Sequence, residues 1–224
     1  MLRSLKDLEC YSVSALDGEL GGIKDFFLDD ERWIIRYLIV GVGGILGGRP
    51  VGISPRSFLR AEAATYRFHV ALTVANVDDL PGVNVDEPGS LPSDAHLKSA
   101  RDVGKYQIQG SDGAIGHVAD FIVDDETWEV RYLVVDVGHW RFGRRVLVSP
   151  HWASRVSWNE RRIYLDLTGE QVRGSPEWDP GSPVNRQYEE RLYDYYGHPV
   201  YWANAPLGQE ANRSSTGVPS KHEK

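Results

Sequence analysis

A glycine-rich run at residues 41–48 is the first segment whose composition could do chemistry, because loops of this kind can cradle a phosphate group. The run has neither the Gly-x-Gly-x-x-Gly spacing of a dinucleotide site nor the Gly-Lys-Ser/Thr ending of a phosphate-binding loop. The residues that follow it resemble a strand rather than the helix that such sites need. We therefore expect these glycines to serve as turn positions, and we predict that the chain binds no cofactor.

Two acidic triplets could in principle offer oxygen ligands to a hard cation, since Asp-Asp-Glu occurs at residues 29–31 and again at 124–126. Three adjacent residues on a tight turn do not converge easily on one ion, so we expect solvated hairpin tips. The seven histidines show no metal-ligand spacing and Cys10 is the only cysteine. We predict no metal site, and without a nucleophile motif we expect a protein that is not an enzyme.

A basic and aromatic patch at residues 139–145 stands out from a chain whose formal net charge is -7. Such interleaving is typical of surfaces that contact RNA or an acidic partner. The negative net charge makes nucleic acid an unlikely general partner, because phosphate contacts need clustered Lys and Arg. A protein partner is therefore favoured over nucleic acid, and we slightly favour a solvated rim loop over a dedicated binding site. The candidate partner-binding residues are His139, Trp140, Arg141, Phe142, Arg144 and Arg145.

The elements that must position these residues follow from an internal repeat with a period of 95 residues. The recurring segments are residues 17–21, 25–33, 36–40 and 54–55, each found again 95 positions later. The same offset runs without a gap from Leu2/Leu97 to Thr73/Thr168. Solenoid repeats are shorter, at about 20 to 50 residues. The period therefore predicts two copies of one small domain.

Within each copy the pattern is that of β-strands. Residues 26–28 and 33–40 are rich in aromatic and branched side chains, with an acidic turn between them, and the second copy repeats this arrangement. Five or six short strands in about 70 residues predict a small closed or nearly closed β-barrel.

Two residue types recur at matching positions of the strands and favour a structural role. Trp33 recurs as Trp128, and we expect both side chains in the core. Arg36 recurs as Arg131, and we expect each arginine to pair with a carboxylate such as Asp25 or Asp120.

The C-terminal part of the chain differs from the repeats. Residues 185–196 show helical spacing, and Gly197 and Pro199 would end the helix. The segment either packs on the chain's own barrels, which we favour, or forms an arm that docks on a second subunit, so a homo-oligomer stays open. The candidate interface residues of this arm are Tyr188, Leu192, Tyr195, Tyr196, Tyr201 and Trp202.

The chain is thus expected to divide into five parts. These are a first repeat at 1–77, a linker at 78–95, a second repeat at 96–174, a Tyr/Trp-rich segment at 175–207 and a disordered tail at 208–224. The apolar runs are too short to span a bilayer. The first residues lack the apolar stretch of a secretion signal, so we expect a cytoplasmic protein.

The repeated pattern resembles that of the PRC-barrel family. In both copies Asp-Gly-x-Leu/Ile-Gly precedes Asp-Phe-x-Leu/Val-Asp-Asp-Glu-x-Trp, then Arg-Tyr-Leu-Ile/Val-Val, and finally Ile/Val-Ser-Pro. The resemblance covers residues 2–174 and is most specific at 17–55 and 112–150. It implies an all-β fold of two small PRC-type β-barrels in tandem, followed by the short helical and aromatic segment. It also implies barrels that bind protein partners and carry no catalytic residues.

That family is named after the cytoplasmic domain of the photosynthetic reaction-centre H subunit, and it includes the C-terminal domain of a bacterial ribosome-maturation factor. This chain shows neither the membrane helix of the first nor the separate N-terminal domain of the second. It is more similar to the stand-alone tandem PRC-barrel proteins of bacteria. The resemblance therefore implies an adaptor for protein–protein interactions. The alternative is an RNA- or ribosome-associated factor that uses residues 139–145.

Overall fold

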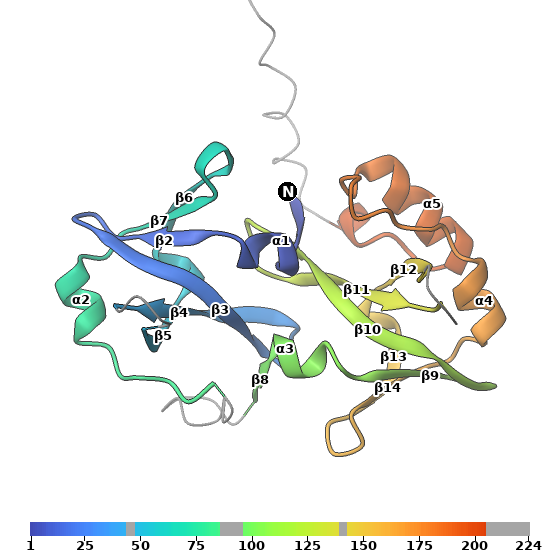
Figure 1. Ribbon diagram of the computed structural model, residues 1–224. Helices are drawn as coiled ribbons and strands as arrows, with labels where there is room; N and C mark the ends of the chain where they lie inside the picture. Colours follow the sequence, from blue (N-terminus) through green and yellow to red (C-terminus); the bar gives the residue numbers. More distant parts are fainter. Residues whose placement is uncertain (44–47, 86–95, 139–142, 205–224) are drawn as a thin grey trace, which may run out of the picture.

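The computed structural model describes residues 1–43, 48–85, 96–138 and 143–204, which consist mainly of β-strands (Figure 1). The main strands of the first repeat are β2 (Ser12–Ser14), β3 (Glu19–Asp29), β4 (Ile34–Val42), β5 (Arg49–Ile53), β6 (Phe58–Glu62) and β7 (Arg67–Val70). Those of the second are β9 (Gln107–Gly110), β10 (Gly113–Asp124), β11 (Val130–Asp136), β12 (Arg145–Val148), β13 (Ala153–Ser157) and β14 (Arg162–Leu165). The repeats begin with β1 (Leu2–Ser4) and β8 (Leu97–Ser99).

The helices are short, apart from one. The α-helices are α1 (Leu5–Glu9), α2 (Val74–Asp78), α3 (Ala100–Val103), α4 (Gly169–Gly174) and α5 (Arg186–Tyr196). The 3-10 turns used below are η1 (Pro55–Ser57), η4 (Pro150–Trp152) and η5 (Tyr201–Asn204). Among the described residues, no helix is long and apolar enough to cross a membrane.

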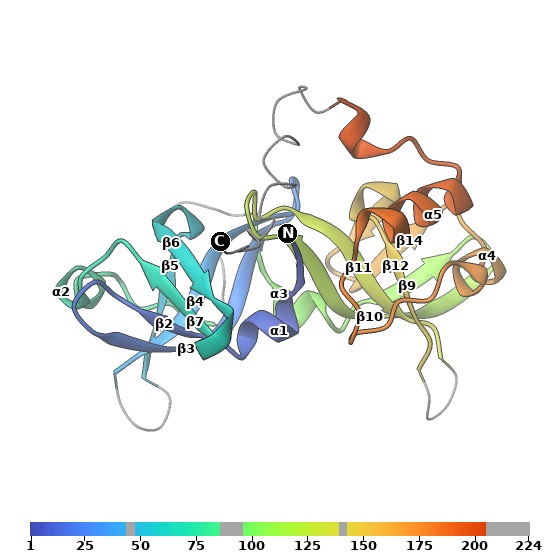
Figure 2. The same ribbon diagram turned by 90° about the horizontal axis from the view of Figure 1, so that it is seen from above.

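Two seven-stranded sheets lie side by side, with α1 and α3 between them (Figures 1 and 2). The order β5-β4-β3-β2-β7-β6 of the first sheet is reproduced as β12-β11-β10-β9-β14-β13 in the second. The parallel pairing of β2 with β7 is likewise reproduced by β9 with β14. This arrangement confirms the predicted all-β fold of two similar halves.

The first strand of each repeat pairs with the opposite sheet. Strand β1 runs antiparallel to β10, with Ser4 opposite Ile122. Strand β8 runs antiparallel to β3, with Ser99 opposite Phe27. The two halves therefore exchange equivalent strands reciprocally. The predicted boundaries at 1–77 and 96–174 divide the sequence, whereas each sheet in space holds a strand of the other repeat.

Each exchanged strand is held by a buried carboxylate. Ser99 donates a hydrogen bond to Asp25 at 2.5 Å, and Ser4 donates the equivalent bond to Asp120, also at 2.5 Å. Both serines also cap the short helix that follows, by accepting a hydrogen bond from one of its backbone amides. One serine in each repeat thus fixes both the strand and the start of the helix.

Both carboxylates lie in the interior, where Asp25 is 1% and Asp120 is 6% exposed. Backbone amides of both repeats also donate hydrogen bonds to these carboxylates. Among them, the amide of Arg101 donates to Asp25 at 3.1 Å and that of Lys6 donates to Asp120 at 3.3 Å. Burial raises the pKa of both carboxyl groups, although the hydrogen bonds act in the opposite direction.

Each acidic turn is followed by a tryptophan that packs against the other half. Trp33 and Trp128 adopt left-handed backbone conformations, with φ of 55° and 61°. The backbone oxygen of Trp128 accepts from the amide of Ile35 at 2.8 Å, and that of Trp33 accepts from Val130 at 2.7 Å. The ring of Trp33 packs beside Trp158 of the second repeat. Both tryptophans are buried, which confirms their prediction as core residues.

The prediction that the acidic turns are solvated tips is confirmed for Glu31 and Glu126, which are exposed, but was wrong for the aspartates. Asp29 is buried, and its side chain is satisfied there by hydrogen bonds that it accepts from two backbone amides of the turn. The next residue, Asp30, pairs with Lys98 of the exchanged strand at 3.0 Å. Its counterpart Asp125 pairs with Arg3 at 2.7 Å. Within the described residues, no group of three His, Cys, Asp or Glu side chains is placed to hold a metal.

The repeated Asp-Gly-x-Leu/Ile-Gly motif is explained by two close contacts. Asp17 accepts a hydrogen bond from the first amide of α2 at 2.8 Å, and Asp112 accepts the same bond from α4. The final glycines, Gly21 and Gly116, lie against backbone carbonyls of the neighbouring strands, where a β-carbon would overlap. Both features serve the fold.

We predict that Ser99→Ala lowers the free energy of unfolding by about 1–3 kcal/mol, because the buried Asp25 loses a hydrogen bond and α3 loses its cap. Urea denaturation measures the change. Ser154→Ala, at an exposed serine of β13, is the matched control and should change stability by less than about 0.5 kcal/mol. Equal, small effects from both variants would show that Asp25 does not hold the exchanged strand.

We also predict a pH dependence with a defined sign. Because folding raises the pKa of Asp25 and Asp120, their contribution to stability is fully present below the unfolded value of about 4 and is lost as pH rises through the folded values. The stability of the wild type minus that of an Asp25→Asn/Asp120→Asn variant should therefore fall with rising pH. A difference that does not change with pH contradicts this assignment.

Candidate functional site

The predicted C-terminal helix is present as α5 and covers the second sheet. The side chain of Asn185 caps its start by accepting from the amide of Tyr188 at 2.9 Å, and Gly197 ends it in the left-handed conformation. Figures 1 and 2 show α5 on the outer side of the second half, away from the first. The helix is therefore positioned by its own caps and by the sheet beneath it.

A second core forms where α5 meets the sheet. Its buried members are Ile122, Tyr132, Val134, Leu147, Trp178, Tyr188, Leu192 and Tyr193. Of the predicted arm residues, Tyr188 and Leu192 belong to this core, and three others pack against it, namely Tyr196, Tyr201 and Trp202. Tyr195 is 44% exposed. The arm thus lies on its own second repeat, and its docking on another subunit stays a prediction.

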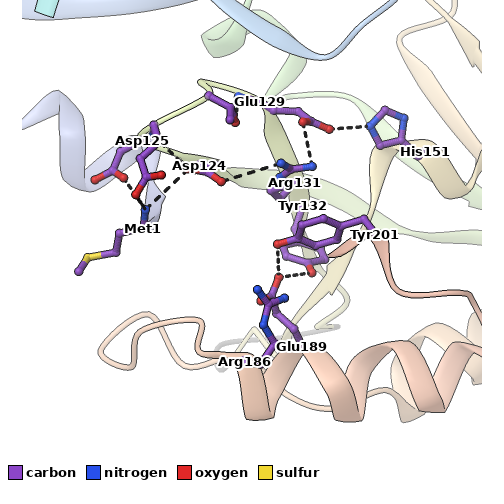
Figure 3. Close-up of polar contacts among 12 residues, drawn as sticks. Met1, Asp124, Asp125, Glu129, Arg131, Tyr132, His151, Arg186, Glu189 and Tyr201 are labelled. Carbon is purple, nitrogen blue, oxygen red and sulfur yellow. Dashed lines mark hydrogen bonds and ion pairs between the residues drawn. The ribbon is translucent and has the colours of Figure 1, made fainter. Parts of the chain in front are cut away.

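Glu189 is the polar centre of this second core. It is only 3% exposed and accepts hydrogen bonds from the hydroxyls of Tyr132 at 2.7 Å and Tyr201 at 2.9 Å (Figure 3). Arg186 lies 3.2 Å from its other oxygen. Burial, with the nearby carboxylate, raises the pKa of both tyrosine hydroxyls, so they remain protonated donors.

Arg131 joins the arm to the sheet, and it pairs with a carboxylate as predicted, although that carboxylate is Glu129 and not Asp120. Its guanidinium lies 2.8 Å from Glu129, and the ring of Tyr201 stacks over it at 4.3 Å (Figure 3). Asp120 instead accepts a hydrogen bond from Ser4 of the exchanged strand β1. The sequence pattern could not reveal this, because the exchange of strands brings a new partner to the carboxylate.

The predicted basic loop is described only in part, since residues 139–142 lie outside the described residues. Arg144 donates to the backbone oxygen of Ser175 at 2.7 Å, just as Arg49 donates to Leu80 at the equivalent place in the first repeat. Arg145 begins β12, opposite Asp136. Arg144 therefore makes a contact that both repeats share, and the RNA interpretation of this loop stays a prediction.

A cleft of about 770 Å³ lies between the two repeats. One wall comes from β4, η1 and β6 of the first repeat, and the other is the turn at residues 125–128 of the second. Four aromatic residues, Tyr37, Phe58, Phe68 and Trp128, line it together with basic groups. The arginines of the cleft are Arg32, Arg36, Arg56 and Arg60.

The cleft is positively charged within an acidic chain. Against its four arginines stand the carboxylates of Asp125 and Glu126. Asp125 is already paired with Arg3 at 2.7 Å. It also pairs with the amino group of Met1 (Figure 3). Arg32, Arg56 and Arg60 are exposed. The arrangement is suited to binding an anion, because clustered guanidinium groups attract carboxylate or phosphate.

The second repeat lacks this cluster. Thr127 and His151 stand where the first repeat has Arg32 and Arg56. Of the two arginines that are kept, Arg131 lies under the ring of Tyr201 at 4.3 Å, while Arg155 stacks on Tyr164 at 4.0 Å and stays exposed. Sequence analysis missed the cluster because its members are spread along the chain. A position-by-position comparison of the two copies could have revealed this arginine cluster.

Comparison with known proteins identifies the domain type. Residues 97–172 match the family model of the PRC-barrel domain. The chain is also 33% identical, over 108 residues, to an uncharacterized protein of Deinococcus radiodurans. That similarity covers 48% of this chain and 37% of the relative, so the chain spans little more than a third of the relative's length.

We predict that Leu192→Ala lowers the free energy of unfolding by about 2–5 kcal/mol, because it opens a cavity between α5 and the second sheet. Glu190→Ala, at an exposed position of the same helix, is the matched control. Thermal and urea denaturation report both changes. If the two variants melt alike, α5 is not an integral part of the second core.

Proposed function

We propose that the chain, in which residues 97–172 form a PRC-barrel domain, is a non-catalytic module that binds a protein partner in the cleft between its repeats. The charge and the position of the cleft carry this proposal. The cleft has a volume of about 770 Å³, lies between the two repeats and is lined by four arginines, a cluster that the second repeat lacks.

The groups that line the cleft favour binding over catalysis. Arginine stays protonated at ordinary pH, so it stabilises an anion but does not exchange protons with a substrate. The hydroxyl of Ser54, another lining residue, accepts a hydrogen bond from the amide of Arg56 as the cap of η1. The most buried carboxylates, those of Asp25 and Glu189, are engaged in hydrogen bonds outside the cleft.

The junction of the repeats gives the cleft its shape. The turn at residues 125–128 reaches the first repeat because Trp128 packs against Phe58 and because the backbones of both turns pair. A partner would therefore contact both repeats at once. We extend the proposal to a cytoplasmic adaptor, as the resemblance to the PRC-barrel family implies.

A retention experiment tests this function. The full chain is immobilised and exposed to lysate of the source organism, and bound proteins are identified by mass spectrometry. We expect at least one protein to be retained by the wild type and lost with Arg56→Ala/Arg60→Ala. The matched control is His151→Ala/Arg155→Ala, at the equivalent exposed positions of the second repeat, and it should retain the same protein. Identical retention by the wild type and both variants refutes the cleft as the binding site.

A further inference from the structure

We infer that the cleft binds the phosphate of a phosphorylated side chain on the partner protein, an inference that rests on the proposed function. The phosphate would be held by the three exposed arginines of the first repeat, Arg32, Arg56 and Arg60. Arg36 also lines the cleft, but it already takes part in another contact and is not needed.

The exposed arginines leave positive charge in the cleft. Among the residues that the structure describes, neither Arg32 nor Arg56 forms an ion pair with an acidic side chain. Arg60 lies near Glu62, but the carboxylate of Glu62 accepts a hydrogen bond from the hydroxyl of Thr65 at 2.9 Å. The guanidinium groups of these arginines are therefore available to an anionic occupant.

The two carboxylates of the opposite wall have cations of their own. Asp125 lies 2.7 Å from the guanidinium of Arg3, and Glu126 lies 3.8 Å from the amino group of Met1. These contacts offset the negative charge of that wall. What charge remains on it repels an anion towards the arginines of the first repeat.

Two hydroxyl groups extend the set of donors in the cleft. The side-chain oxygen of Ser54 accepts from the amide of Arg56 at 3.4 Å, and that of Thr127 accepts from the amide of Glu129, also at 3.4 Å. A hydroxyl that accepts in this way still has its own proton to donate. The lining therefore offers guanidinium and hydroxyl donors together, which suits an anion with several acceptor oxygens.

A phosphate monoester matches these donors better than a single carboxylate does. Near pH 7 it carries a charge of about -1.5 to -2 and three acceptor oxygens, whereas a carboxylate has one charge and two oxygens. A guanidinium group binds phosphate through two parallel hydrogen bonds, so one phosphate can engage more than one arginine. Clusters of arginine are a recurring means of recognising phosphorylated segments.

The second repeat shows that the fold does not require the three arginines. Two of the three equivalent positions hold Thr127 and His151 instead. The third holds Arg155, which stacks on Tyr164 at 4.0 Å and lies 3.6 Å from Glu160. The same barrel thus forms with two of these arginines absent and the third paired, which favours a binding role for them in the first repeat.

The remaining wall of the cleft suits a peptide. Phe58 is partly buried between Phe68 and Trp128, with ring centroids 5.2 Å from each, and Leu59 is 59% exposed. Residues that flank the phosphorylated side chain can pack on this surface. A nucleic acid strand needs roughly six or more phosphate contacts to bind usefully at physiological salt. Three exposed arginines offer fewer, so a protein segment is favoured.

The test uses a tetramethylrhodamine-labelled peptide, Gly-Leu-Ala-phosphoserine-Ala-Leu-Gly, and fluorescence anisotropy with the full chain. We expect binding that weakens with added salt. Arg56→Ala/Arg60→Ala should weaken it about tenfold, because each exposed ion pair is worth up to a factor of about five. The matched control, His151→Ala/Arg155→Ala, should leave it within about twofold, since these residues lie outside the cleft.

Two altered peptides complete the binding test. Serine in place of phosphoserine should abolish binding. A pair of glutamates in its place should bind several-fold more weakly, because two separate side chains must then be ordered to present the same charge. Absence of phosphopeptide binding overturns the inference, and so does equal binding of either altered peptide. Equal weakening by the two protein variants, or tighter, cleft-dependent binding of a single-stranded oligouridine, overturns it as well.

A phosphatase separates this inference from the proposed function. The lysate of the retention experiment is treated with a phosphatase, which is then removed, before it meets the immobilised chain. We expect the treatment to abolish retention of the protein that Arg56→Ala/Arg60→Ala also fails to retain. If the treated protein is still retained through Arg56 and Arg60, the proposed function stands and the phosphate inference is overturned.

Discussion

Asp25 and Asp120 lie where each sheet receives a strand from the opposite repeat, and each carboxylate is bound by a serine of that strand. A buried carboxylate is costly unless hydrogen bonds satisfy it, and here the donors come from both repeats. Neither site is satisfied while the halves are apart. This requirement links the folding of one sheet to the presence of the other, and it makes the two repeats one structural unit.

The shape of the molecule follows from that link. Because the strands cross over, the acidic turns meet at the junction, and Trp33 and Trp128 pack in the opposite halves. The arginine cleft is a product of the same geometry, since one of its walls is the turn that leads to Trp128. Its position therefore depends on the buried carboxylates, although none of them lines it. The second repeat in addition holds α5, which adds a core of its own.

Much of the fold could be predicted from the sequence. The period of 95 residues revealed two halves, and Asn185 and Gly197 marked the ends of α5. The strand exchange could not be predicted, because β1 and β8 have the same pattern and suit either sheet equally well. The helices α2 and α4 were missed because five or six residues show no clear periodicity. The cleft was missed because Arg32 and Arg56 come to line one cleft only after folding. Arg144, a predicted partner-binding residue, makes a backbone contact shared by both repeats.

Reciprocal exchange of strands has a consequence for how the two halves can change. Two separate, identical chains joined in this way would form a twofold-symmetric dimer, in which any substitution alters both copies of a surface. Covalent linkage keeps the same pairing within one chain, where it no longer depends on protein concentration. Each surface can then vary alone. The arginines of the cleft, of which the second repeat keeps only two, and the helix that covers part of the second sheet alone are differences of this kind, which one chain can hold because its two copies change separately.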